Sequence, residues 1–241
     1  MRTVLLTGHT GGIGLACAKQ LLSQEHNVIG ISRTTIESTQ LQTNQERLHQ
    51  YSIDLSQPAE LDGALKPIFS KHAIDAVICN AGEGLFGSIE NFSASQIESN
   101  VAINLISPLI LLRNAMSELK KHERSDIIFI GSESSLKGGR YGSVYSASKF
   151  GLRGAAQSLR YECAGSNCHV GIVQPGMVNT GFFDDLAFKP GPHENHSLHA
   201  SNIADAVLSM LNAPDNAVIE EIVVNPLQHV VQKKEARKKK Q

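Results

Sequence analysis

The stretch "TGHTGGIG" (7–14) joins an apolar run, "TVLLT" (3–7), to a segment with helical periodicity (12–24). Such a turn is typical of dinucleotide-binding sites, because the helix N-terminus presents free N–H groups and a positive dipole end to a pyrophosphate. Gly8 permits a tight turn, while Gly12 and Gly14 allow close approach of a phosphate and of the helix. The alternative is a purely structural turn. We favour dinucleotide binding, since strand, turn and helix follow one another as the motif requires.

The end of the next strand-like run, "NVIGIS" (27–32), bears on the choice of dinucleotide. NAD-binding sites place an acid about 20 residues after the glycines to hold the ribose 2′-OH, whereas an arginine nearby accommodates a 2′-phosphate. Here Ser32 stands where the acid is expected, and Arg33 and Thr34 follow. A guanidinium with hydroxyls beside it binds a phosphate well. The sequence therefore predicts NADP(H) in preference to NAD(H), the alternative being that Arg33 only points into solvent.

Short β-rich runs and longer helical patterns alternate along the rest of the chain. Strands are predicted at 3–7, 27–32, 51–53, 75–80, 126–131, 169–173 and 217–225. Helices are predicted at 12–24, 58–72, 95–121, 144–164 and 200–212, with a possible kink at Pro108 and a loop with a short helix at 35–48. This alternation predicts an α/β fold: one Rossmann-fold domain over 1–231 with a doubly wound, mostly parallel seven-stranded sheet and helices on both faces.

Several motifs taken together resemble those of the short-chain dehydrogenase/reductase family over nearly the whole chain. The resemblance is carried by T-G-x-x-x-G-I-G at 7–14, Asp54-Leu55, "CNAG" at 79–82, "INLISP" at 103–108, "IGS" at 130–132, "YSASK" at 145–149 and "PGMVNT" at 175–180. The family usually has an asparagine where Cys79 stands, which weakens one supporting hydrogen bond. The resemblance implies a hydride transfer between a nicotinamide and a carbonyl or secondary alcohol.

The resemblance also implies a role for particular residues. Tyr145 would be the general acid/base, Lys149 would bind the nicotinamide ribose and lower the pKa of the tyrosine, Ser132 would orient the substrate oxygen, and Asn104 would hold a proton-relaying water. Residues expected to bind the cofactor are Gly8, Thr10, Gly12, Ile13, Gly14, Ser32, Arg33, Asp54, Leu55, Asn80, Ala81, Gly82, Tyr145, Lys149, Pro175, Gly176, Val178 and Thr180.

The spacing of Tyr145 and Lys149 has its own physical logic. Positions i and i+4 lie on one face of a helix, one turn apart. An ammonium near a phenol favours the phenolate, so that the tyrosine can exchange a proton near neutral pH. A surface pair or a helix start at the serines is the alternative. Tyr141 and Tyr161 are weaker candidates, since neither has a lysine four residues later.

The segment 181–199 is predicted to cap the active site as a short lid, with an apolar inner surface from Phe182, Phe183, Leu186 and Phe188. Its histidines 193, 196 and 199 lack the HExxH pattern, and no metal is predicted. Lys137 and Arg140 are interpreted as solvated loop charges, with a substrate role as the alternative.

Two other functions compete with the carbonyl reductase. A nicotinamide-binding sensor without turnover would not need Ser132, Tyr145 and Lys149 together. A nucleotide-sugar epimerase or dehydratase of the extended branch of the superfamily would carry a longer C-terminal substrate region and a different glycine spacing.

Composition limits the setting in which the protein works. The chain has 241 residues with a net charge of −1, which gives no overall basic bias toward nucleic acid. Four cysteines without a CxxC pair indicate a reducing compartment, and no apolar run is long enough for a signal peptide or a membrane span. We expect a cytoplasmic protein with a small-molecule substrate and a flexible basic tail at 232–241. The resemblance implies a homodimer or homotetramer, paired through helices 95–121 and 144–164.

Overall fold

The computed structural model describes residues 1–37, 41 and 44–234. A central sheet of seven parallel strands has the order β3-β2-β1-β4-β5-β6-β8. Its strands are β1 (Thr3–Thr7), β2 (Asn27–Ser32), β3 (Leu48–Ser52), β4 (Ala76–Cys79), β5 (Ser125–Ile130), β6 (Cys168–Pro175) and β8 (Glu221–Val224). The strand order reverses beside β1, as it does in a doubly wound sheet, which confirms the predicted fold class.

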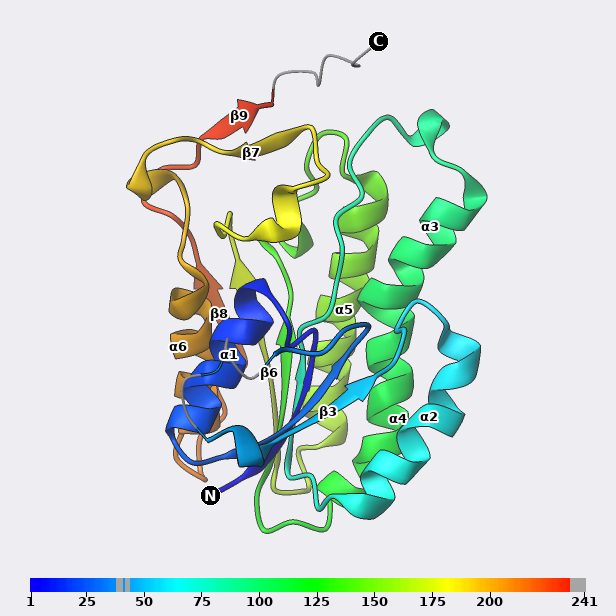
Figure 1. Cartoon of the computed structure of the whole chain (residues 1–241), viewed down its shortest axis with the longest axis vertical. Coiled ribbons are helices and arrows are strands. Elements are labelled where there is room, and N and C mark those ends of the chain that lie inside the picture. Colours follow the sequence, from blue (N-terminus) through cyan, green and yellow to red (C-terminus); the bar gives the residue numbers. More distant parts are fainter. Residues whose placement is uncertain (38–40, 42–43, 235–241) are drawn as a thin grey trace.

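Helices cover both faces of this sheet (Figure 1). They are α1 (Gly12–Ser23), α2 (Pro58–Lys71), α3 (Ala94–Val101), α4 (Ser107–Leu119), α5 (Ser143–Glu162) and α6 (Ala200–Leu211). One buried cluster lies under α2, α4 and α5 and includes Leu65, Leu111 and Phe129. A second lies under α1 and α6 and includes Leu21, Ile78 and Val207. Because both faces are covered, strands such as "SDIIFI" are apolar nearly throughout.

The long helix predicted at 95–121 is present as an unbroken helical run from Ala94 to Leu119, but it is not α-helical throughout. The π-helical segment η4 (Ala102–Ile106) separates α3 from α4. Pro108 lies in the first turn of α4. Proline is tolerated there because the π-helical turn before it already departs from the regular α-helical hydrogen bonding that proline would disrupt. The interruption is therefore a widened turn just before the proline rather than a kink at it.

Two further strands lie outside the central sheet and were not predicted. β7 (Phe188–Pro190) pairs antiparallel with β9 (Val231–Lys233), and Figure 1 shows the pair at the end of the molecule where the C-terminus emerges. β9 begins at the residue before the predicted tail and includes its first two residues, while 235–241 lie outside the described residues. The bounds of three strands of the central sheet also differ: β3 starts earlier, β6 is longer and β8 is shorter than predicted.

Short 3-10 helices lie in the connecting segments. They are η2 (Gln45–Arg47), η3 (Ile89–Asn91), η5 (Glu133–Ser135), η6 (Gly181–Phe183) and η7 (Glu194–His196). Within the described part of the chain, no helix is both long enough and apolar enough to cross a membrane.

Candidate active site

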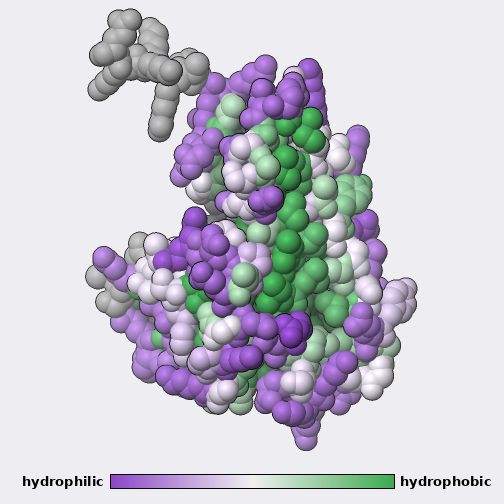
Figure 2. Space-filling view, turned by 90° about the vertical axis from the view of Figure 1, so that its right-hand side faces the viewer, coloured by the Kyte–Doolittle hydropathy of each residue, from purple (hydrophilic) through white to green (hydrophobic). Residues whose placement is uncertain are grey.

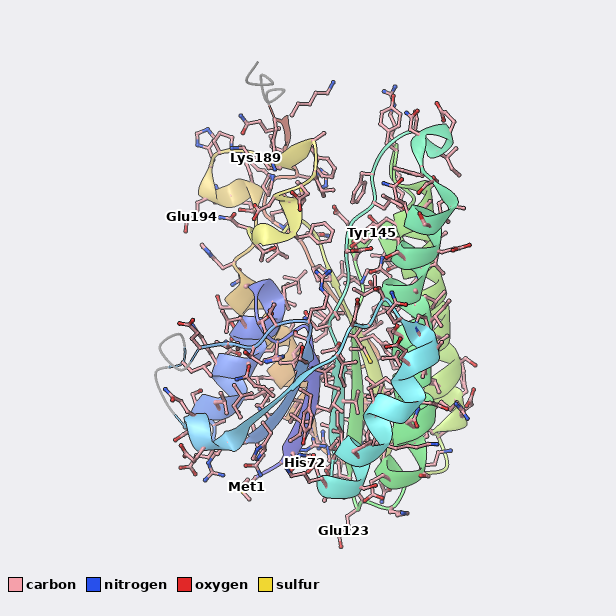
Figure 3. All side chains as sticks on the ribbon, turned by 45° about the vertical axis from the view of Figure 1, so that its right-hand side comes forward. Met1, His72, Glu123, Tyr145, Lys189 and Glu194 are labelled. Carbon is pink, nitrogen blue, oxygen red and sulfur yellow. The ribbon has the colours of Figure 1, made fainter. Side chains whose placement is uncertain are left out.

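A cavity of about 1380 Å³ opens beyond the carboxyl ends of the parallel strands. This is where ligands bind in open α/β sheets, at the point where the strand order reverses. Figure 3 shows Tyr145 on the side of the lid segment that carries Lys189 and Glu194, and far from Met1, His72 and Glu123 at the opposite end of the strands. The lid predicted at 181–199 supplies residues 181–183, 187 and 188 to the cavity lining.

The glycine-rich turn forms one end of the cavity. Gly8 (φ 70°) and Gly12 (φ 51°) occupy the left-handed region that favours glycine. Gly14 lies beneath the turn, where a Cβ would come within 2.1 Å of the Gly8 carbonyl oxygen. Asn80 ties the turn to β4, because its Nδ2 donates to the carbonyl oxygens of Thr7 (2.9 Å) and Gly8 (3.2 Å). Backbone shape at this end therefore depends on residues with little or no side chain.

His9 connects the turn to the loop that follows β2. Its buried ring fills the space beside Gly30, where a Cβ would lie 2.6 Å from the imidazole carbons. The Oε1 of Gln50 lies 2.9 Å from His9 Nε2 and also accepts a hydrogen bond from the Ile36 N–H (2.7 Å). Since that oxygen can only accept, His9 Nε2 is the donor. Burial lowers the pKa of His9, so the imidazole stays neutral. The ring fills the space between the turn and Gly30 of β2.

The loop after β2 supplies Ser32, Arg33 and Thr34 to the same end of the cavity. The Ser52 hydroxyl donates to the carbonyl oxygen of Arg33 (2.9 Å), which fixes the backbone, while the guanidinium side chain is exposed. Asp54, which was expected to bind the cofactor, is exposed and accepts hydrogen bonds from the Ser56 N–H and hydroxyl. These bonds lower the pKa of Asp54, with a smaller contribution from Arg33.

Ser132, Tyr145 and Lys149 come together at the middle of the cavity. Ser132 follows β5, and both Tyr145 and Lys149 lie on α5 with relative exposures of 6% and 4%. Ser132 forms a side-chain hydrogen bond with the Tyr145 phenol. Lys149 Nζ donates to the Ile130 carbonyl oxygen (3.0 Å) and lies 5.9 Å from the centroid of the Tyr145 ring. The Ser132 hydroxyl, the Tyr145 phenol and the Lys149 ammonium thus lie near one another in the wall of the cavity.

The pKa of Tyr145 differs from the expectation that Lys149 lowers it. Burial raises the pKa of Tyr145 to about 12, the hydrogen bond with Ser132 lowers it, and the charge of Glu133 raises it. The ammonium of Lys149 donates to a backbone carbonyl oxygen and not to the phenolic oxygen. This accounts for the weak effect of Lys149 on the pKa of Tyr145. Burial also lowers the pKa of Lys149 to about 8. The protein alone therefore holds a neutral phenol at neutral pH.

Gln174 is a site residue that sequence reasoning missed. Fully buried on β6, it accepts hydrogen bonds at Oε1 from the Ser132 N–H (2.9 Å) and the Ser135 hydroxyl (2.6 Å). Its Nε2 donates to Glu221 (2.8 Å), which is paired with Arg153 through two bonds of 2.9 Å. This chain of bonds fixes the backbone of Ser132 from behind. Gln174 stands just before the "PGMVNT" motif, and that position was the one sequence signal that could have drawn attention to it.

Asn104 lies beside the cavity rather than in its wall. Within the π-helical segment, it accepts from the Glu83 N–H (3.0 Å) and donates to the Glu83 carbonyl (3.0 Å), Asn100 (3.1 Å) and the Ser148 hydroxyl (3.2 Å). A Cβ at Gly82 would lie 2.8 Å from Asn104 Oδ1 and 3.4 Å from Lys149 Nζ. The small size of Gly82 therefore keeps the amide and the ammonium close to each other.

Most of the residues predicted for the site line this one cavity. They are Gly8, Thr10, Gly12, Ile13, Ser32, Arg33, Leu55, Asn80, Ala81, Gly82, Ser132, Tyr145, Lys149, Pro175, Gly176, Val178 and Thr180. Gly14, Asp54 and Asn104 are not among the lining residues. The lining also includes Phe86 and four residues near the C-terminal end, His229, Val231, Lys233 and Lys234, which sequence reasoning did not place there.

Comparison with known protein families matches residues 2–189 to the short chain dehydrogenase family. The chain belongs to the short chain dehydrogenase family. It is thus an oxidoreductase, in agreement with the resemblance seen in the sequence motifs.

Relatives match this chain over most of its length, and a solved structure shares its fold. An uncharacterized oxidoreductase of Staphylococcus epidermidis is 28% identical, over 94% of this chain and 97% of the relative. A 3-ketodihydrosphingosine reductase of Bacteroides thetaiotaomicron is 30% identical, over 76% of this chain and 66% of the relative. The structure of an alcohol dehydrogenase from Thermococcus sibiricus, complexed with 5-hydroxy-NADP, has the same fold at 23% identity and a TM-score of 0.81, covering 95% of this chain and 99% of that one.

The residues of the site fit the nicotinamide dinucleotide that such family members bind. The cavity runs from the glycine-rich turn to Tyr145, and its volume of about 1380 Å³ exceeds that of a typical small-molecule pocket. Gly8, Gly12 and Gly14 leave the first end clear of side chains, so a pyrophosphate can approach the N-terminus of α1. Among the described residues, no group of three or more histidine, cysteine, aspartate or glutamate side chains is placed to hold a metal ion.

Proposed function

We propose that this enzyme is an NADP(H)-dependent oxidoreductase that interconverts a carbonyl and a secondary alcohol, with Tyr145 as general acid/base. The observation that supports this most strongly is the meeting of Ser132, Tyr145 and Lys149 in the same cavity as the glycine-rich turn. When bound, the nicotinamide supplies or accepts the hydride exchanged with the substrate carbon. The chain itself must position the substrate oxygen and move one proton.

Each residue of the cluster has a distinct part in moving that proton. In the reduction direction, the neutral phenol of Tyr145 donates its proton to the substrate oxygen. The Ser132 hydroxyl donates a hydrogen bond to the same oxygen, and this bond strengthens as negative charge develops there. Lys149, whose Nζ lies 5.9 Å from the centroid of the Tyr145 ring, would bind the nicotinamide ribose, and Asn104 would join the route by which the proton is replaced. Because burial keeps the phenol protonated, Tyr145 can donate its proton to the substrate oxygen during reduction at neutral pH.

The cofactor would be held along the turn and the strand ends. The turn 8–14 would take the pyrophosphate, Ala81 and Gly82 the middle, and Pro175, Gly176, Val178 and Thr180 the nicotinamide end. Ser32, Arg33 and Thr34 line the end where an adenosine 2′-phosphate would lie, which supports NADP(H) as the preferred form. A metagenomic short-chain oxidoreductase solved with NADP is 26% identical, whereas a 4-hydroxyisoleucine dehydrogenase of similar fold was solved with NADH.

Cofactor binding and turnover test this proposal separately. Fluorescence titration should give a dissociation constant for NADPH about 10- to 100-fold below that for NADH, and Arg33→Ser should remove most of the difference. Tyr145→Phe should bind NADPH as the wild type does while losing about 100- to 10,000-fold in kcat on any carbonyl that is reduced. NADPH binding without turnover of any carbonyl by either protein would favour the alternative of a nicotinamide-binding sensor, whereas equal turnover by both proteins would overturn the role of Tyr145.

We also propose a homodimer or homotetramer paired through α4 and α5. Figure 2 shows a continuous hydrophobic band on the face of the molecule that carries these helices. The exposed apolar side chains there include Ile106, Leu109 and Phe150, with exposures of 39%, 40% and 44%. Contiguous exposed apolar surface of this kind commonly marks an interaction site. Light scattering should give a multiple of 26.0 kDa for the wild type and a smaller particle for Leu109→Lys.

A further inference from the structure

Five aromatic side chains form a closed series of ring contacts, called the aromatic circuit below. They lie at the end of the cavity near Tyr145, which is called the substrate end after the proposed function. Tyr145 contacts Phe86 and Phe182, with ring centroids 5.0 Å and 5.9 Å away. Phe86 contacts Phe188 at 5.1 Å, Phe188 contacts Phe183 at 5.8 Å, and Phe183 contacts Phe182 at 5.2 Å. All five residues line the cavity. The ring that exchanges the proton in the proposed function is therefore one member of an aromatic group.

Backbone contacts hold these rings in place from several segments of the chain. Phe188 lies on β7, which is paired with β9, and the Lys234 ammonium donates to the carbonyl oxygens of Phe183 (2.5 Å) and Asp184 (2.8 Å). Next to Phe86, the Gly87 N–H donates to the Tyr141 carbonyl (2.7 Å). The chain has eight phenylalanines, and four of them belong to this circuit. Half of the phenylalanines of the chain therefore lie at this one site.

Most charged side chains near the circuit already have partners within the protein. Glu133 lies 3.0 Å from His229, and Arg140 bonds the Tyr141 hydroxyl (3.1 Å) while its guanidinium stacks 4.8 Å from the Tyr141 ring centroid. The Lys234 ammonium donates hydrogen bonds to the carbonyl oxygens of Phe183 and Asp184. Lys233, also in the lining, lies on the exposed strand β9. A charged group beside the reacting carbon would lose its hydration against aromatic rings and gain little in return.

We propose that the aromatic circuit receives the apolar group attached to the carbonyl carbon of a neutral aryl or alkyl ketone, or of the matching secondary alcohol. This inference rests on the proposed function, because it names the class of substrate that the Tyr145 site reduces. Rings arranged edge to face offer an apolar group contact on several sides, so recognition depends on its size and shape. Phe86, Phe182 and Phe188 are then specificity-determining residues.

The experiment compares substrates that differ only in charge or in apolar length. The full chain with NADPH is given benzoylformate beside its methyl ester, acetoacetate beside methyl acetoacetate, and a series of methyl ketones of increasing chain length. We expect kcat/KM for each ester to exceed that of its acid by at least about tenfold, and a rise of about tenfold or more along the ketone series. This comparison on the wild type does not depend on the folding of any variant.

Variants then show whether the rings are the cause. Phe188→Ala and Phe86→Ala should flatten the dependence on chain length and leave the NADPH dissociation constant unchanged. Phe69→Ala, which removes a partly buried ring on α2 away from the cavity, should keep the full dependence.

Three outcomes count against the proposal. Equal or faster reduction of the acids would overturn the substrate class and leave the reductase function intact. An unchanged chain-length dependence in both cavity variants would overturn the role of the circuit. A lack of turnover with every compound, together with NADPH binding, would overturn the substrate class and the proposed function together.

Discussion

The two ends of the cavity are built in different ways. The cofactor end consists of backbone and small residues that follow one another in the turn 7–14, held by Asn80 and the buried His9. The substrate end consists of large rings that come from the loop after β4, from η6, from β7 and from α5. A backbone site fails where an added atom meets the turn itself, whereas a site made of side chains changes its preference gradually. Substitutions should therefore act sharply at the first end and by degrees at the second.

Gly14→Ala should give the largest effect, because it tests the steric limit of the cofactor end. Its Cβ would meet the Gly8 carbonyl oxygen at 2.1 Å and Asn80 Nδ2 at 2.6 Å, so the turn itself must move. We expect the free energy of unfolding to fall by about 3 kcal/mol or more, and NADPH affinity to fall with it. Urea unfolding and fluorescence titration measure the two quantities.

Gly63→Ala is the matched control for that substitution. Gly63 lies in α2 with open space around it, so an added methyl should raise the free energy of unfolding by about 0.5–1 kcal/mol. The steric account of the turn fails if both variants unfold alike and bind NADPH as the wild type does.

Lys149 lies where the two ends meet and gives the next largest effect, a dependence of stability on pH. Burial lowers its pKa from 10.5 to about 8. Between these values the unfolded chain holds a proton that the folded chain has lost, so stability rises with pH. Below pH 8 both states are protonated and the full cost of burying the charge is present. Relative to Lys149→Met, the wild type should gain about 3 kcal/mol in free energy of unfolding over this window.

The comparison with Lys149→Met removes the titration of other groups. Tyr145, whose raised pKa of about 12 acts at higher pH, is present in both proteins and cancels in the difference. Denaturant unfolding from about pH 8 to pH 10 supplies the data. Parallel pH curves for the two proteins would contradict the buried-ammonium account.

Gln174→Leu should have the smallest of these effects and act on the substrate end alone. It removes the acceptor of the Ser132 N–H and the Ser135 hydroxyl, and leaving such donors unpaired costs about 1–3 kcal/mol. We expect kcat to fall more than KM rises, because Ser132 loses its fixed position, while NADPH affinity stays unchanged.

Gln57→Leu is the matched control for Gln174→Leu, since Gln57 is exposed before α2 and its side chain makes no capping hydrogen bond. It should change the free energy of unfolding by no more than about 0.5 kcal/mol. A loss of NADPH affinity in Gln174→Leu as large as the loss of kcat would show that the two ends are not separable.

The sequence predicted the position and the backbone shape of the glycine-rich turn, for a physical reason. A turn that needs left-handed backbone at Gly8 and Gly12 accepts few residue types, so its chemistry is visible in consecutive letters. The alternation of apolar runs likewise predicted all seven strands of the central sheet, because parallel strands are buried on both faces.

The substrate end could not be predicted in the same way. Phe86 and Phe188 are about a hundred residues apart in the chain, and nothing in either segment specifies their contact. The bond from Gln174 to Ser132 spans 42 positions, and the pairing of β7 with β9 depends on where the C-terminal segment crosses the lid. The π-helical turn that carries Asn104 was also missed, since apolar periodicity does not distinguish it from an ordinary helical turn.

The close fit of His9 against Gly30 has an evolutionary consequence. A side chain at position 30 would collide with the imidazole, and it could enter only after His9 had been replaced by a smaller residue. A smaller residue at position 9 would in turn give up the hydrogen bond to Gln50 that steadies the loop bearing Arg33. A variant with a side chain at position 30 should therefore survive only where position 9 has changed first. We expect positions 9 and 30 to change together in relatives that have altered their cofactor preference.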